Sequence, residues 1–275
     1  MKEIEINNQK LVTGDCHKWL KGQDDNTIDI VVTSPPYNLK INYNKYKDNK
    51  DIAAYFEWLH SIFSEVNRVM TDSGSFFLNM GGTNVNPWIP MDVGHLCRDI
   101  FTLQNHIIWI KSISIDGYTY GHFKPINSGR FLNHTFEHLF HFTKEGDVLI
   151  NRLEIGVPFA DKSNIKRYKH GKDLHCRGDC WHIPYETIID KASKGKHPAI
   201  FPISLPEYCV KLAGFDKDTI VCDPFVGTGT TLVASSNLGT HGIGIDIDPH
   251  YIKFAYKRLK KLNDQENLDE YLRKE

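Results

Sequence analysis

A run of apolar, mostly β-branched residues at 28–32 is followed closely by two consecutive prolines, Pro35 and Pro36. The run predicts a buried strand, because such residues fill strands that are covered on both faces. Neither proline can donate a backbone hydrogen bond to a neighbouring strand, so the strand must end before them. We therefore expect an α/β sheet with a rigid bend at the carboxyl end of a strand, the edge where open α/β sheets bind ligands.

The bend carries a hydroxyl, backbone carbonyls and an aromatic ring, which together suit a flat heterocycle that bears an amino group. Tyr37 would stack on the heterocycle, while the Ser34 hydroxyl and the Pro35 carbonyl would accept the two amine hydrogens. That arrangement turns the nitrogen lone pair out of conjugation and makes it a nucleophile. A plain proline turn or an exposed proline-rich ligand accounts for the same residues, so the interpretation requires a cofactor site elsewhere.

A second strand–turn–helix unit lies near the carboxyl end of the sequence, at 219–237. Gly227 and Gly229 in its turn permit close approach of a ligand or a positive φ. Asp246 ends the next predicted strand, where an acid meets a ribose in nucleotide-binding βαβ units. The unit therefore predicts a nucleotide-like ligand, with ordinary strand–helix packing as the alternative.

The residues around these glycines favour one class of ligand over another. A nicotinamide dinucleotide site needs a third glycine where this chain has Leu232. Asp223 and Phe225 add a carboxylate and an aromatic ring to the turn, which suits a sulfonium cation better than a pyrophosphate. The pattern therefore favours a sulfonium cofactor over a nicotinamide one.

Strands and helices alternate along most of the chain. Apolar residues at helical spacing predict helices at 51–70, 90–101, 205–213 and 249–262, the third of them capped by Ser204. Apolar runs predict strands at 10–12, 75–80, 106–110, 137–142, 219–222 and 241–246. Asp15 follows the first of these strands and would either accept from an adenine amine or cap the next helix. The segment 112–134 is predicted to be a functional loop.

The alternation breaks at 151–196, which we interpret as a small inserted lobe. Residues 1–150 and 197–263 would then form one catalytic and cofactor-binding domain, followed by a charged, fraying tail at 264–275. The basic stretch 166–172 suits a nucleic-acid surface, although a charge run is also typical of a solvated face.

Four potential metal ligands lie close together in this lobe, namely His175, Cys176, Cys180 and His182. A C-x3-C spacing without a second pair is a weak zinc signal, so we expect free thiols and no metal. The six cysteines of the chain are mostly scattered, which indicates reduced thiols rather than disulfides.

The net charge of −1 means that any nucleic-acid face must come from local clustering of basic residues. No apolar run is long enough to span a bilayer, and no basic-then-apolar leader opens the sequence. We therefore expect a cytoplasmic protein without a membrane partner.

These motifs, in this order, resemble those of the β-group DNA amino-methyltransferases, which use S-adenosylmethionine. The catalytic Ser/Asp/Asn-Pro-Pro-Tyr motif of that family is matched by Ser34, Pro35, Pro36 and Tyr37. Its cofactor motif, Asp-Pro-Phe-x-Gly-x-Gly-Thr-Thr, is matched by Asp223, Pro224, Phe225, Gly227, Thr228, Gly229, Thr230 and Thr231. The ribose-binding acid matches Asp246, the acid near the adenine matches Asp15, and Thr33 and Ser34 are expected beside the cofactor. The stretch 197–202 looks like the segment that cradles its methionine end.

The resemblance implies a doubly wound, Rossmann-like methyltransferase fold with a seven-stranded, mostly parallel sheet and one reversed strand. The motif order is circularly permuted, with the catalytic motif first, a target-recognition insert at 151–196 and the cofactor motif last. It also implies double-stranded DNA as the substrate, with the target base flipped out before a direct methyl transfer. A monomer or a homodimer fits equally well.

The first residue of the catalytic motif bears on the target base. In the family, Ser at the position of Ser34 is commoner among N4-cytosine enzymes, and Asp among N6-adenine enzymes. We therefore predict a site-specific N4-cytosine methyltransferase of a restriction–modification or epigenetic system, with N6-adenine as the first alternative. A non-catalytic DNA-binding module is a remoter alternative, and a cognate restriction endonuclease acting independently is left open as a partner.

Overall fold

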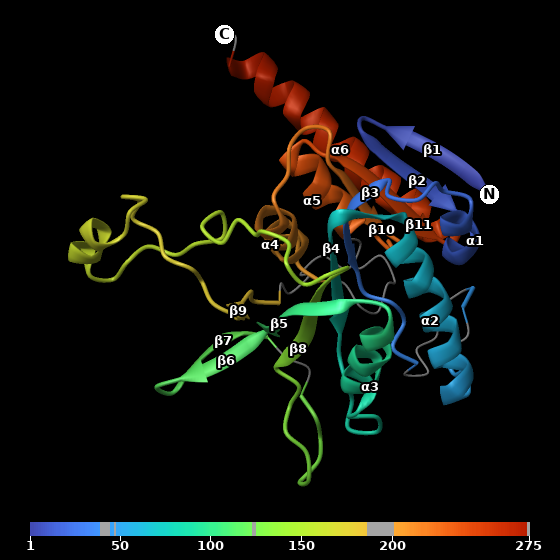
Figure 1. Ribbon diagram of the computed structural model, residues 1–275, viewed down its shortest axis with the longest axis horizontal. Helices are drawn as coiled ribbons and strands as arrows, with labels where there is room; N and C mark the ends of the chain where they lie inside the picture. Colours follow the sequence, from blue (N-terminus) through green and yellow to red (C-terminus); the bar gives the residue numbers. More distant parts are fainter. Residues whose placement is uncertain (39–44, 47, 123–124, 186–200, 274–275) are drawn as a thin grey trace.

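The computed structural model describes residues 1–38, 45–46, 48–122, 125–185 and 201–273. Its main strands are β1 (Lys2–Ile6), β2 (Gln9–Thr13), β3 (Ile28–Thr33), β4 (Met70–Met80), β5 (Thr102–Ile110), β8 (Phe136–Thr143), β9 (Cys180–His182), β10 (Ile220–Asp223) and β11 (His241–Asp246). Within the described ranges they form a nine-stranded sheet in the order β1-β2-β11-β10-β3-β4-β8-β5-β9 (Figure 1). The seven strands from β2 to β5 in this order correspond to the predicted sheet.

The count of seven strands was too low, because β1 and β9 extend the two edges of the sheet. β1 is almost wholly exposed and β9 has only three residues, so neither carries the buried apolar run by which the other strands were predicted. The α/β class with a mainly parallel sheet is nevertheless confirmed.

Strand direction fixes which side chains meet at each edge of the sheet. β2, β11, β10, β3 and β4 are parallel to their neighbours in this series, whereas β8 is antiparallel to both β4 and β5. β8 is therefore the reversed strand, and its amino end lies at the edge where the parallel strands have their carboxyl ends.

In the part of the chain that the structure describes, three helices cover each face of the sheet. The first face packs against α1 (Cys16–Lys21), α2 (Ile52–Val69) and α3 (Ile89–Leu96). The second face packs against α4 (Ser204–Ala213), α5 (Thr230–Leu238) and α6 (Pro249–Arg273). The apolar residues of the strands are thus buried on both sides, which explains their almost continuous β-branched and aromatic runs. None of the helices in the described residues has the length and apolar character needed to cross a membrane.

Several helices begin or end differently in the structure than the sequence predicted. The helix predicted over 90–101 ends at Leu96 and continues as a short 3-10 turn, Cys97–Asp99. Ser204 begins α4, but the cap residue is Ile203 and no side chain caps the helix, so the Ser204 cap was wrong. The tail predicted to fray is helical through Arg273, because its Glu, Leu, Lys and Arg residues all favour a helix.

Two segments extend away from the sheet on the same side of the molecule (Figure 1). The predicted loop 112–134 contains a hairpin made of β6 (Ser112–Ile115) and β7 (Tyr118–Gly121). The described part of the predicted lobe, 151–185, contains a 3-10 helix, η2 (Lys162–Arg167), and ends with β9 at the sheet edge. Its buried Ile155 and Trp181 pack against residues of α4, so both ends of this segment are anchored on the main sheet.

Candidate active site

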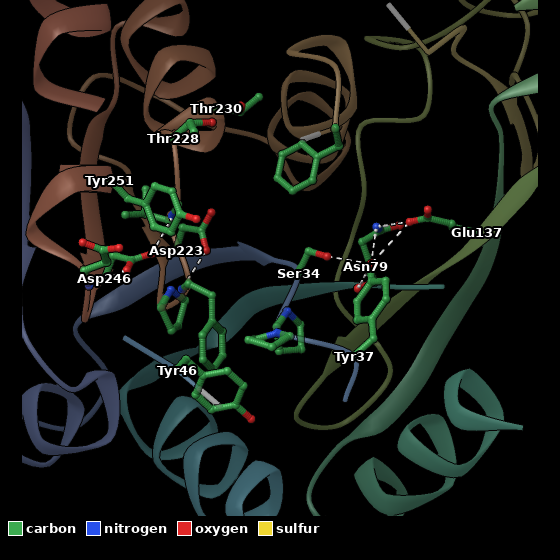
Figure 2. Close-up of a pocket in the computed structure, with 18 of the residues that line it drawn as sticks. Ser34, Tyr37, Tyr46, Asn79, Glu137, Asp223, Thr228, Thr230, Asp246 and Tyr251 are labelled. Carbon is green, nitrogen blue, oxygen red and sulfur yellow. Dashed lines mark hydrogen bonds between the residues drawn. The ribbon is translucent and has the colours of Figure 1, made fainter. Parts of the chain in front are cut away.

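A cavity of about 1000 Å³ opens at the carboxyl edge of the parallel strands (Figure 2). The predicted catalytic residues Ser34, Pro35, Pro36 and Tyr37 line one side of it. Most of the predicted cofactor residues line the other side, namely Asp15, Asp223, Pro224, Phe225, Gly227, Thr228, Thr230 and Asp246. The proline bend and the glycine turn, about 190 residues apart in sequence, therefore share one hollow. Thr33, Gly229 and Thr231 do not line it and lie behind its wall.

Asp223 joins the two halves of this wall. It is 2% exposed, and its Oδ1 accepts from the Thr33 hydroxyl at 2.5 Å and from the Phe225 amide at 3.0 Å. Its Oδ2 accepts from the Thr231 hydroxyl at 2.6 Å. Burial raises the pKa of Asp223 to about 6, while these hydrogen bonds oppose the rise. The carboxylate predicted to face a sulfonium thus also fastens the end of β3 to the start of α5.

The glycine turn has backbone angles that residues other than glycine adopt only with strain. Gly227 and Gly229 have φ values of 48° and 83°, in the left-handed region that favours glycine. A Cβ on Gly229 would lie 2.7 Å from the Cβ of Ala255, so this glycine also permits α6 to pack closely against the turn. The two glycines therefore have different roles, since Gly227 lines the cavity and Gly229 supports it.

Asp246, at the end of β11, is held by backbone donors. Its Oδ2 accepts from the Gly227 amide at 3.1 Å, and its Oδ1 accepts from the Asp248 amide at 2.7 Å. Burial is the main cause that raises the pKa of Asp246 to about 7, and the charges of Asp248 and Asp223 add to it. Each carboxylate oxygen retains a further lone pair, so the group can still accept from a pair of ribose hydroxyls.

Asp15 takes one of the two roles that the sequence left open, the helix cap, and its predicted contact with an adenine amine stays a prediction. Its Oδ1 accepts from the Lys18 amide at 2.9 Å and caps α1, and its side chain also borders the cavity. Aromatic rings also line the cavity, where Phe225 meets Trp58 edge-on at 5.6 Å between ring centroids. Trp58 in turn stacks on Tyr46 at 5.2 Å.

The other side of the cavity is built from several strands. The Ser34 hydroxyl lies 2.6 Å from the Tyr37 hydroxyl, which lies 3.3 Å from Glu137 Oε2 (Figure 2). Asn79 Nδ2 donates to the Tyr37 hydroxyl at 3.0 Å and to Glu137 Oε2 at 2.6 Å. Lys111 Nζ reaches Glu137 Oε1 at 2.8 Å. This network of hydroxyls, an amide and a carboxylate can orient a polar planar ligand beside the Tyr37 ring.

A side chain of α2 holds the proline bend in place. The Tyr55 hydroxyl, on a residue that is fully buried, donates to the Pro36 carbonyl at 2.8 Å. The carbonyl of Pro36 thus has a structural partner, and the amine-accepting role predicted for the Pro35 carbonyl stays a prediction.

Comparison with known proteins decides the class of this site. The family model of the N6_N4_Mtase DNA methylases matches residues 28–257, which is most of the chain. The chain belongs to this DNA methyltransferase family.

Curated relatives agree with the family match. The methyltransferase is 30% identical to the type II methyltransferase M.BglII of Bacillus subtilis, over 94% of this chain and 71% of that protein. It is 26% identical to the DNA adenine methyltransferase YhdJ of Escherichia coli strain K12, over 90% of this chain and 82% of that protein.

Among solved structures, the fold is similar to that of the PvuII DNA methyltransferase (cytosine-N4-specific). The TM-score is 0.69 at 20% identity, over 94% of this chain and 90% of that chain. TTHA0409 of Thermus thermophilus, solved in complex with S-adenosyl-L-methionine, gives 0.62 at 24% identity, over 91% and 93% of the two chains. These likenesses show the same Rossmann-like fold.

Sequence reasoning missed three polar residues that line the cavity of the methyltransferase beside Ser34 and Tyr37, namely Asn79, Lys111 and Glu137. Asn79 lies at the end of a strand that was predicted, so its position was visible in the sequence. Glu137 lies at the start of β8, and the reversed direction of that strand brings it to the same edge. A search for polar residues at the amino end of the reversed strand would have found it.

Two other predictions concern residues 197–202 and the four potential metal ligands at 175–182. Of the stretch 197–202, only Phe201 and Pro202 are within the described residues, and Phe201 lines the cavity. His175, Cys176, Cys180 and His182 are all described, and across the described ranges no group of three or more metal-ligating side chains could hold an ion.

Proposed function

We propose that the protein is a site-specific DNA methyltransferase that transfers a methyl group from S-adenosylmethionine to N4 of cytosine. The observation that carries the proposal is the single cavity shared by the Ser34–Tyr37 bend and the Gly227–Asp246 side. A cavity of about 1000 Å³ is large enough for a cofactor and a base together. The names of the curated type II relatives support a restriction–modification context.

The cofactor occupies the glycine-turn side. Asp246 accepts from its ribose hydroxyls, and Asp15 accepts from the adenine amine. The aromatic face of Phe225 and the carboxylate of Asp223 attract the sulfonium. The related TTHA0409 structure with bound S-adenosyl-L-methionine supports this cofactor.

The target cytosine stacks on Tyr37, and its amine donates to the Ser34 hydroxyl and the Pro35 carbonyl. Those two bonds aim the nitrogen lone pair at the sulfonium methyl. The nitrogen–carbon bond forms as the carbon–sulfur bond breaks, the sulfur keeps the electron pair and leaves as the thioether S-adenosylhomocysteine, and the methylated amine releases one proton to solvent. Alignment of the two reactants supplies most of the acceleration, because the sulfonium is already a strong electrophile. No covalent enzyme–base intermediate is required.

Double-stranded DNA approaches the mouth of the cavity, and the base enters by flipping out, which costs a few kcal/mol of unstacking. Lys111, His122 and His134 line the cavity and add polar and cationic groups to it. The β6–β7 hairpin and the basic 3-10 segment η2 extend on one side of the molecule (Figure 1). We assign the lobe at 151–196 to target recognition on this basis.

The experiment that tests the proposal is methyl transfer from labelled S-adenosylmethionine to unmethylated, PCR-amplified genomic DNA. Digestion to nucleosides and mass spectrometry should then give N4-methylcytosine. N6-methyladenine without N4-methylcytosine would overturn the choice of base and leave a DNA amino-methyltransferase. The adenine alternative is favoured by one observation, the 26% identity to a protein named a DNA adenine methyltransferase.

A further inference from the structure

A carboxylate that lies outside both sequence motifs stands at the end of the hydrogen-bond chain from Ser34. Glu137 is paired with Lys111, and both side chains are 17% exposed. Its Oε1 faces Lys111 Nζ, while its Oε2 faces Asn79 Nδ2 at 2.6 Å and the Tyr37 hydroxyl at 3.3 Å. Charge-assisted hydrogen bonds of this kind are stronger than neutral ones, so Glu137 dominates the local field.

The charges around Tyr37 decide where its hydroxyl proton points. The hydroxyl oxygen lies 3.2 Å from the Asn79 carbonyl oxygen and 3.3 Å from Glu137 Oε2, both of which only accept. A proton turned toward Ser34 instead would leave the Tyr37 oxygen facing these two acceptors with no hydrogen between them. The arrangement that satisfies these two acceptors has the Tyr37 hydroxyl donating toward them and the Ser34 hydroxyl donating in the 2.6 Å contact with Tyr37.

The amide of Asn79 supports the same direction. Its Nδ2 donates to both the Tyr37 hydroxyl and Glu137 Oε2. A reversed amide would set Asn79 Oδ1 against the carboxylate, so Glu137 also fixes the orientation of this side chain. The Tyr37 oxygen then accepts two hydrogen bonds, one from Asn79 and one from Ser34.

We infer that Glu137 is a positioning residue for methyl transfer, which acts through Tyr37 to turn the lone pairs of Ser34 Oγ toward the target amine. The inference deepens the proposed function and rests on it. With its own proton committed to Tyr37, Ser34 Oγ can only accept from the amine. Polarisation along the chain from Glu137 to Ser34 strengthens that acceptor, because hydrogen bonds in series reinforce one another.

Replacing the carboxylate by an amide tests the inference. In Glu137→Gln, Lys111 Nζ only donates and so takes the amide oxygen, which sets the amide nitrogen opposite Asn79 and Tyr37. The Tyr37 proton then turns to Ser34 Oγ at 2.6 Å in preference to the Asn79 carbonyl at 3.2 Å, and the Ser34 hydrogen points at the amine. We expect the single-turnover rate of methyl transfer to fall on the order of 10-fold, the loss of about one hydrogen bond. The Kd for S-adenosylmethionine, measured by calorimetry, should stay within about twofold, because no cofactor contact changes.

A double-mutant cycle distinguishes this role from a merely structural one. Tyr37→Phe keeps the stacking ring and removes the hydroxyl through which Glu137 acts. The double variant should therefore be no slower than Tyr37→Phe alone, since coupled residues are not additive. Glu65→Gln, which breaks the Glu65–Arg68 ion pair on α2, is the matched control and should keep the wild-type rate.

The inference is wrong if Glu137→Gln transfers methyl at the wild-type rate, or if the effects of Glu137→Gln and Tyr37→Phe multiply. Should Glu137→Gln not fold, Glu137→Asp in the wild-type and Tyr37→Phe backgrounds gives the same coupling. A wild-type protein that labels no DNA would instead overturn the proposed function, and this inference with it.

Discussion

The two sides of the cavity are held by carboxylates in different ways. On the cofactor side, Asp223 and Asp246 accept mainly from backbone amides and hydroxyls within 223–248. On the base side, Glu137 is reached by side chains from the ends of β4 and β5 and from the proline bend. Most donors to the first set of carboxylates lie within one short stretch of the chain, with the Thr33 hydroxyl added from β3, whereas the donors to Glu137 come from separate parts of the sheet.

This difference separates the carboxylates that stabilise the fold from the one that serves the chemistry. Both oxygens of Asp223 are engaged in a buried site, so removing it takes an acceptor from two hydroxyls and an amide, of which Thr231 keeps a 3.5 Å contact with the Val32 carbonyl. The base side is more open, and its groups stay near the surface of the cavity. We therefore expect cofactor-side substitutions to cost folding free energy and base-side substitutions to cost mainly rate.

Asp223→Ala should have the largest effect. We expect the free energy of unfolding to fall by about 2–4 kcal/mol, because the Thr33 and Thr231 hydroxyls and the Phe225 amide lose their acceptor in a buried site. Urea unfolding followed by circular dichroism measures the change.

A matched control is Asp25→Ala, which removes an exposed ion pair with Arg68. This variant should lose less than about 1 kcal/mol, since exposed salt bridges contribute little. Equal losses for the two variants would show that the buried carboxylate does not fasten the wall of the cavity.

Tyr37→Ala tests the base side of the cavity. We expect the methyl-transfer rate to fall about 10- to 100-fold, because stacking of a base on an aromatic ring contributes about 1–3 kcal/mol. Cofactor affinity should change by less than about twofold, since Tyr37 lies on the opposite side from Gly227 and Asp246. Single-turnover kinetics and calorimetry give the two quantities.

An exposed aromatic residue away from the cavity provides the control. Phe215 is 39% exposed after α4 and does not line the cavity, so Phe215→Ala should leave the rate unchanged. A parallel loss of rate and cofactor affinity in Tyr37→Ala would contradict the division of the cavity into two sides.

The same contrast explains how much of the site the sequence could predict. The glycine turn and the proline bend are each one continuous stretch of sequence. Each residue type in them has a local physical reason, such as the positive φ of Gly229. The order of the two motifs was therefore enough to place them at one edge of a parallel sheet. Glu137 and Lys111 are ordinary charged residues, one at the start of β8 and the other just after β5, and only the pairing of β8 with β4 and β5 brings them together.

The outer elements of the fold were likewise harder to predict from the sequence than its buried strands. Buried strands such as β3 were predicted because both of their faces are apolar. β9 was missed because three residues show no periodicity, and its place depends on pairing with β5, about 70 residues away. The continuation of α6 was missed because its carboxyl-terminal part has no apolar stripe, although its residues favour a helix.

The pH dependence of cofactor binding should give the smallest effect and the sharpest test of the cofactor side. Burial raises the pKa of Asp246 to about 7, so a large share of the empty sites carries a neutral carboxylic acid at neutral pH. Ribose hydroxyls donate to the charged carboxylate, so binding must favour the deprotonated form. The affinity for S-adenosylmethionine should therefore rise as the pH increases from about 6 to about 8, by up to about 10-fold per pH unit below the pKa. Calorimetry over this range checks it, with Asp246→Asn as the control, because an amide does not titrate and should bind weakly at every pH. A wild-type affinity that is flat over the same range would mean that the ribose does not meet this carboxylate.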